Sequence, residues 1–134
     1  MRDTFYIDDD NFLKTDLYQE FLRNHPGRGN LKIRAYAASE ALPVSGLKIV
    51  VSTELEQDRI IFFEGETDAS GMIETLSLPT PALDLNNLEV PATITYRVTA
   101  TTKNSSSQEF LVKMYEGICD VQNINFVFGG QNGN

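Results

Sequence analysis

Three glutamates form the most suggestive pattern of reactive side chains in this sequence. Glu64 and Glu66 lie two residues apart, so both would project from one face of a strand, and Glu74 follows after a turn at Asp68. Paired carboxylates can act as general acid and general base without any further group. The same spacing is typical of a solvated strand face whose negative charge discourages edge pairing, and we favour that interpretation.

Metal ligands and nucleophiles are scarce. His25 and Cys119 are the single histidine and the single cysteine, whereas a zinc site needs three or four ligands. We interpret His25 as a cap residue at a helix end and Cys119 as a small buried or half-buried side chain. The acidic run at residues 8–10 lacks the glycine and the later glutamate of a calcium loop and suits a helix N-terminus. We therefore expect no enzymatic activity, no catalytic residue, no metal and no cofactor.

Charge and composition exclude several kinds of partner. The chain has 134 residues, with 11 Lys plus Arg against 19 Asp plus Glu, and a net charge of −8. This charge opposes the counterion release that drives binding to nucleic acid. No apolar run approaches the roughly 20 residues of a membrane span. The first ten residues hold four acidic residues against one basic residue and lack the apolar core of a signal peptide, and the compartment stays open.

An amphipathic helix is predicted over about residues 11–24, within an acidic N-terminal segment at residues 1–30. Its large side chains recur at spacings that place them along one stripe. They are Phe12, Leu13, Leu17, Tyr18, Phe21 and Leu22. Thr15 or Asp16 can cap the start of the helix, and Pro26 ends it. Six large apolar side chains need a cover, so we expect the helix to dock on its own domain or on a partner.

From Leu31 onward the hydrophobic period changes from that of a helix to two, as in a strand with one buried face. Seven such segments follow, near residues 31–37, 47–52, 59–65, 72–78, 94–101, 110–114 and 124–128. They predict an all-β fold over residues 31–128, a seven-stranded antiparallel Greek-key β-sandwich, with a barrel plugged by the helix as the alternative. The tail at residues 129–134 has no apolar residue and is expected to be disordered.

Alternation within these strands also predicts the core. The inward residues are Ile33, Ile49, Val51, Tyr96, Val98, Val112, Ile124 and Phe126. The segment at residues 79–92 is bracketed by prolines and is long for a loop, which favours a functional role. Asp84, Asn86 and Asn87 are its candidate ligand-binding residues.

Several motifs resemble a known family. They are the runs at residues 29–36 and 41–51, the turn sequence Thr-Asp-Ala-Ser-Gly at residues 67–71, and the strands at residues 96–100 and 122–126. Together they resemble the carboxypeptidase regulatory-like, or prealbumin-like (transthyretin-like), β-sandwich modules of Firmicutes envelope and spore-associated proteins. The resemblance covers about residues 29–128. It implies the sandwich fold and a cell-envelope, spore or extracellular setting. The family name refers to a module beside an enzyme and does not by itself imply peptidase activity.

The main functional hypothesis is a non-enzymatic accessory module for protein–protein interaction or assembly in a bacterial envelope or spore. In this hypothesis the helix at residues 11–24 contacts a protein partner or a second copy. The alternative is a carbohydrate-binding module that uses the loop at residues 79–92, with Tyr36, Tyr96 and Tyr115 available to stack on a glycan. The absence of Trp counts against it.

A second alternative is an isopeptide-stabilised adhesin- or pilin-type domain, in which Lys32 would be joined to Asn123 or Asn125. The alternation places Leu31 and Ile33 inward and therefore turns Lys32 outward, which argues against such a bond.

Overall fold

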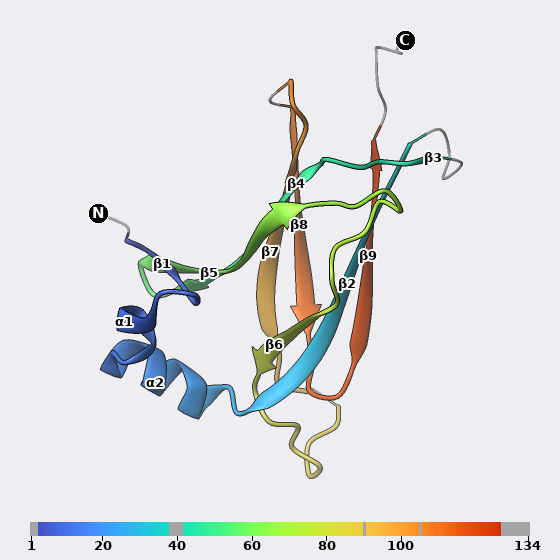
Figure 1. The fold of residues 1–134 in the computed structure, drawn as a ribbon. Helices are drawn as coiled ribbons and strands as arrows, with labels where there is room; N and C mark the ends of the chain where they lie inside the picture. The colour runs from blue at the N-terminus through green and yellow to red at the C-terminus, as the bar shows by residue number, and fades with distance from the viewer. Residues whose placement is uncertain (1–2, 38–41, 90, 105, 127–134) are drawn as a thin grey trace.

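A computed structural model describes residues 3–37, 42–89, 91–104 and 106–126. It consists of two β-sheets packed face to face, with two short helices at one side (Figure 1). Sheet A has, in spatial order, β1 (Thr4–Tyr6), β5 (Asp58–Glu66), β4 (Lys48–Leu55), β7 (Ile94–Thr101) and β8 (Ser107–Met114). Sheet B is built around β2 (Gly27–Ala37), which pairs with β3 (Leu42–Pro43), β6 (Leu76–Thr80) and β9 (Cys119–Phe126).

Strand β2 organises sheet B because it has partners along both edges. Along one edge it pairs antiparallel with β6 and β3. Strand β9 pairs with β2 in parallel from Asn30 to Ala37, a range that overlaps the other two pairings. Strand β9 therefore occupies the opposite edge of β2 and ends the sheet on that side within the described residues.

The predicted all-β sandwich is confirmed. Its seven predicted strands correspond to β2 and β4 to β9, and the short strands β1 and β3 are additions. Pairing is mainly antiparallel, with parallel pairs between β1 and β5 and between β2 and β9. Residues 127–134, which include the predicted disordered tail, lie outside the described residues.

Three strands begin four or more residues away from the predicted position: β2, β6 and β9, the last of which begins at Cys119 and not near residue 124. Strand β2 begins at Gly27, within the predicted N-terminal segment, because the glycines there are strand residues and not a linker. A Cβ atom on Gly29 would lie 2.7 Å from the carbonyl oxygen of Tyr115, so no larger residue fits. Strand β6 begins at Leu76, because residues 72–75 form only an isolated bridge to β2 although Ile73 is buried.

The core lies between the two sheets and contains every core residue that the alternation predicted. Those eight side chains are at most 9% exposed. Tyr96 is fully buried, and its hydroxyl donates to the carbonyl of Pro79 at 2.6 Å. The alternation of apolar and polar residues predicts the core correctly because one face of each strand is buried and the other faces solvent.

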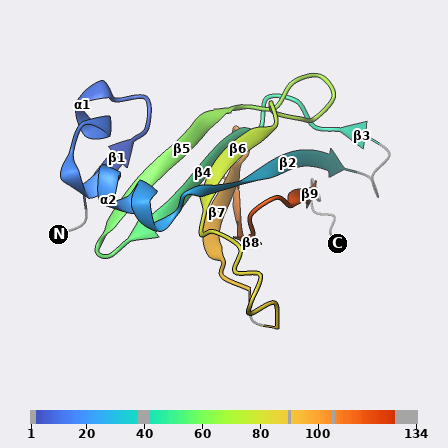
Figure 2. The ribbon, with the colours of Figure 1, turned by 90° about the horizontal axis from the view of Figure 1, so that it is seen from below.

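The predicted N-terminal helix forms as two helices, α1 (Asp10–Leu13) and α2 (Asp16–Asn24). The break occurs because the Thr15 hydroxyl donates to the carbonyl of Phe12 and accepts from the amide of Tyr18, which caps the second helix. Both helices lie beside β1 and one end of β5 (Figure 2). The ring of Phe21 is 2% exposed and lies 6.0 Å from the ring of Phe62 on β5, so the helical segment packs on its own sandwich.

Candidate functional site

The outward face of sheet A carries a ladder of alternating charges. Arg97 on β7 lies 3.6 Å from Glu54 on β4 and 3.3 Å from Glu109 on β8, and Arg59 on β5 lies 3.9 Å from Glu54. Two guanidinium groups thus face two carboxylates across four strands. The ladder is balanced, so it offers no net charge to a ligand.

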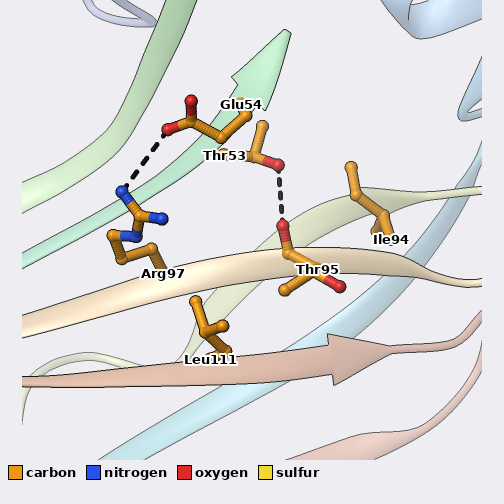
Figure 3. Close-up of a pocket in the computed structure, with 6 residues that line it drawn as sticks. All are labelled: Thr53, Glu54, Ile94, Thr95, Arg97 and Leu111. Carbon is orange, nitrogen blue, oxygen red and sulfur yellow. Dashed lines mark hydrogen bonds and ion pairs between the residues drawn. The ribbon is translucent and has the colours of Figure 1, made fainter.

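A hollow of about 290 Å³ lies beside this ladder (Figure 3). Its lining comes from β4, β7 and β8 and combines hydroxyl, charged and apolar side chains. They are Thr53, Glu54, Ile94, Thr95, Arg97 and Leu111. The Thr53 hydroxyl already donates to the carbonyl of Thr95 at 2.8 Å, and Arg97 is paired. Thr53, Glu54 and Arg97 are therefore already engaged with groups of their own chain.

A second hollow, of about 460 Å³, lies between the N-terminal segment and β5. It brings Glu64 of the suggested Glu64–Glu66 pair together with Glu74, the possible third carboxylate, and Asp8 also lines it. Glu66 does not line it. Glu64 and Glu66 are exposed, and Glu64 lies 3.4 Å from Lys48, as expected for a solvated strand face. Among the described residues, no group of three or more His, Cys, Asp or Glu is placed to hold a metal ion.

The outward face of sheet B has a different charge. Arg28, Lys32 and Arg34 alternate with buried residues along β2, and all three are exposed. We call these three side chains the basic face. The described residues on the neighbouring outward positions of β9 and β6 include no acidic side chain. On a chain with a net charge of −8, this is a local concentration of positive charge.

The basic face has no internal counter-charge among the described residues. Neither Arg28, Lys32 nor Arg34 takes part in an ion pair there, in contrast to Lys48, Arg59 and Arg97 on sheet A. The guanidinium group of Arg34 lies 5.0 Å from the ring centre of Tyr36, a cation–π contact that holds it over β2. The charges are therefore available to an anionic group from outside.

Sequence reasoning missed the basic face, although part of its signal was present. The alternation of Lys32 and Arg34 with Leu31 and Ile33 placed both cations outward. What the sequence did not reveal is the neighbour, because β9 is about 90 residues away along the chain and pairs in parallel. Its outward residues beside Lys32 and Arg34 are Val121 and Asn123.

The single histidine and cysteine are placed far from any reactive arrangement among the described residues. His25 is the C-cap of α2, and its Nδ1 atom lies 2.7 Å from the carbonyl oxygen of Phe21. Its ring also stacks on the Phe21 ring at 4.3 Å. Cys119 is exposed at the start of β9, which corrects the expectation of a buried or half-buried side chain. Cys119 is exposed because it lies two residues before Val121 and therefore shares the outward face of β9 with it.

The six residues of the candidate interaction helix pack against the core of their own chain. Phe12 and Phe21 are buried, and Leu13, Leu17, Tyr18 and Leu22 are partly buried against them. A contact of this helix with a second chain stays a prediction.

The candidate ligand residues of the loop form a turn. The Asp84 carboxylate accepts from the amide of Asn86 at 2.9 Å, and the Asp84 carbonyl accepts from the amide of Asn87 at 3.1 Å. The side chains of Leu83, Leu85 and Leu88 nearby are exposed. The loop protrudes beyond β6 and β7 (Figure 2). Ligand binding by Asp84, Asn86 and Asn87 stays a prediction.

The residues of the hypothetical isopeptide bond lie on the outward face of sheet B. Lys32, Asn123 and Asn125 are exposed. In the register of β2 and β9, Lys32 lies beside Val121, whereas Asn123 and Asn125 lie beside Arg34 and Tyr36. A buried acid, which the isopeptide chemistry requires, has no place on this exposed face.

No helix among the described residues is long and apolar enough to cross a membrane. No protein-family model matches the sequence, and no curated protein sequence matches it.

Solved structures do match the fold. A 5-hydroxyisourate hydrolase from Klebsiella pneumoniae is 18% identical, with 76% of this chain and 87% of that chain covered and a TM-score of 0.48. Transthyretin from Sparus aurata is 18% identical, with 72% and 90% covered and a TM-score of 0.46. The dioxygenase domain of a dioxygenase carbohydrate-binding protein fusion from Streptomyces sp. SirexAA-E is 12% identical, with 76% and 79% covered and a TM-score of 0.41.

These likenesses concern the fold and agree with a prealbumin-like sandwich. They also correct the main functional hypothesis. We expected a non-enzymatic accessory module, with a glycan-binding module or an isopeptide-stabilised domain as alternatives. The solved proteins of similar fold include a hydrolase and a dioxygenase domain as well as transthyretin. The sandwich fold therefore does not mark the chain as non-enzymatic, and the prediction of a non-enzymatic accessory module is wrong.

Proposed function

We propose that this chain binds an anionic partner through the basic face of sheet B. The observation that carries the proposal is the exposure of Arg28, Lys32 and Arg34 on one strand face, with none of the three in an ion pair among the described residues. Strand residues two apart are separated by about 7 Å, so Lys32 and Arg34 can contact two groups of one ligand. Arg28 extends the same row toward the start of β2.

In this proposal, the negatively charged groups of the partner are carboxylates. A nucleic acid is a poor candidate, because a net charge of −8 repels a polyanion at a distance and three cations neutralise few phosphates. An acidic protein segment carries fewer charges and can present them at matching intervals. The sequence led us to expect a protein partner or self-association. We now give that partner a chemical class, a protein segment that bears carboxylates.

Exposed ion pairs contribute little individually, typically about 0.2 to 1 kcal/mol each. Binding through the basic face alone is therefore expected to be weak and to depend on salt. Reversing two of these charges removes two ion pairs and replaces them with repulsion. The expected loss of binding free energy is about 1.4 kcal/mol, which corresponds to a tenfold change in the dissociation constant.

The test is a charge reversal with a matched control. The double variant Lys32→Glu, Arg34→Glu reverses two charges on the basic face. The control Lys103→Glu, Lys113→Glu makes the same change in net charge at exposed lysines elsewhere. The probe is a fluorescein-labelled heptapeptide in which glutamate alternates with threonine, and its binding is followed by fluorescence anisotropy.

We expect the dissociation constant to rise about tenfold for the basic-face variant and to change less than threefold for the control. Equal weakening in both variants would show that only net charge matters and would refute the proposal. Unchanged binding in the basic-face variant would also refute it.

We also propose the narrower kinship with carboxypeptidase regulatory-like modules of Firmicutes. Its support is the conformation of the two motif turns. Gly46 has a φ of 73° and Gly71 a φ of 76°, the left-handed region that favours glycine. Both glycines stand where the motifs have them.

A further inference from the structure

We infer that the acidic partner joins sheet B as an additional strand along the free edge of β9. This inference rests on the proposed function, because the basic face supplies the charge that selects the partner. Strand β9 pairs with β2 over eight residues on one side. On its other side no strand pairs with it among the described residues. An edge strand presents unpaired amide and carbonyl groups, which can pair with another chain.

The edge of β9 lacks the protection that other edges of this sandwich have. Strand β8, which ends sheet A, carries the exposed charges Glu109 and Lys113. Strand β6 contains Pro79, and β1 has three residues. Strand β9 has eight residues, no proline and one charged residue, Asp120. Charge, proline and shortness are the usual means of preventing pairing at an edge, so β9 is the edge best suited to accept a strand.

The outward side chains of β9 allow the basic face to reach that added strand. Cys119, Val121, Asn123 and Asn125 are exposed, uncharged and short. Strands are about 4.8 Å apart, so an added strand would lie about 10 Å from β2. Long Lys and Arg side chains can extend across one strand with short side chains. Carboxylates on the outward face of the added strand would then meet Lys32 and Arg34.

The inward face of the same edge contains an acceptor without a partner. The Oδ2 atom of Asp120 is buried and has no hydrogen bond within the described residues. Asp120 shares the inward face of β9 with the core residue Ile124. A buried acceptor without a donor is unfavourable, and a small shift of the Asp120 side chain toward the free edge would let a hydroxyl on the inward face of an added strand donate to it.

The two faces together define the sequence pattern of the partner. In a strand, alternate residues share a face, so carboxylates alternate with hydroxyl-bearing residues. Glutamate alternating with threonine fits this pattern, and threonine also favours extended structure. The probe is therefore the heptapeptide with alternating glutamate and threonine. Its control is a heptapeptide of identical composition in which the glutamates are consecutive.

The experiment measures amide hydrogen exchange of residues 119–125 by NMR in the full chain, with and without the alternating peptide. Alternate amides of β9 face the free edge. We expect these amides to exchange at least tenfold more slowly when the peptide is bound. The grouped-glutamate peptide and an alternating peptide with N-methylated backbone amides should bind at least tenfold more weakly.

The outcomes separate this inference from the proposed function. If the peptide binds, depends on Lys32 and Arg34, but leaves exchange in β9 unchanged, strand addition is wrong and binding by the basic face stands. Equal binding of the N-methylated peptide would also overturn strand addition. If no peptide binding depends on Lys32 and Arg34, the proposed function fails. If the free chain shows concentration-dependent protection of β9, the occupant of the edge is a second copy, which contradicts an acidic partner.

Discussion

The hydroxyl of Thr67 accepts a hydrogen bond from the amide of Leu47 at 3.0 Å. It also donates to the carbonyl of Val44 at 2.6 Å. Thr67 begins one of the two turn motifs of the sequence, whereas Val44 and Leu47 belong to the other. A single side chain thus joins two turns that are about 20 residues apart along the chain.

We expect Thr67→Val to lower the free energy of unfolding by about 1 to 3 kcal/mol, because it leaves the amide of Leu47 without this partner in a buried site. Thr67→Ser keeps the hydroxyl and is the matched control. Urea unfolding followed by circular dichroism measures both. Equal stability of the two variants would show that the hydroxyl does not join the turns.

Docking of the N-terminal helices on the sandwich predicts a large effect at Phe21. Its ring is 2% exposed and contacts Phe62. Phe21→Ala should lower the free energy of unfolding by about 3 to 5 kcal/mol, a substantial part of a typical total of about 5 to 15. The exposed neighbour Glu20 provides the control Glu20→Ala. A loss at Phe21 below 1 kcal/mol would contradict docking on the same chain.

Two glycines with similar backbone angles should respond differently to alanine. Gly71 has a φ of 76°, and a Cβ there would collide with the carbonyl oxygen of Ala35. Gly117 has a φ of 79°, and a Cβ there would meet nothing within 4 Å. Gly117→Ala should cost only the backbone strain, about 1 to 2 kcal/mol. Gly71→Ala should cost clearly more in thermal melts, and similar losses at both positions would argue against the close contact.

Stability should fall at high pH in a way that depends on Tyr96. Burial raises the pKa of Tyr96 above its usual value of 10.0, although Arg28 opposes the shift. Below pH 10 both folded and unfolded chains hold this proton. Above pH 10 the unfolded chain loses it first, so unfolding becomes more favourable. Urea unfolding between about pH 8 and pH 11 should therefore show a smaller alkaline loss for Tyr96→Phe than for the native chain. An equal loss would assign the effect to other groups.

The sandwich could be predicted because the alternation of apolar and polar residues indicates which face of each strand is buried. Ile33, Val98 and Ile124 are all buried as predicted, since a shift of one residue would expose every apolar side chain. Boundaries were less predictable where tertiary contacts decide them. Gly27 and Gly29 resemble a linker in the sequence, but close contacts with Thr80 and Tyr115 require glycine within β2.

The candidate site was harder to predict, because it depends on which strands become neighbours. The outward position of Lys32 follows from alternation alone. The uncharged outward face of the neighbouring strand follows only from the parallel pairing of β2 with β9, a long-range contact that no local pattern encodes. The helix side chains Phe12 and Phe21 were noticed for their size, and their partner Phe62 lies on a strand about 40 residues away.

A charge-swap measurement tests the central claim most directly. The Lys32→Glu, Arg34→Glu variant is titrated with two heptapeptides, one alternating glutamate with threonine and one alternating lysine with threonine, in low salt by fluorescence anisotropy. If the basic face selects the partner by charge, the native chain prefers the glutamate peptide and the variant prefers the lysine peptide, each by about tenfold or more. If the variant keeps the preference of the native chain, the basic face does not choose the partner, and the account is wrong.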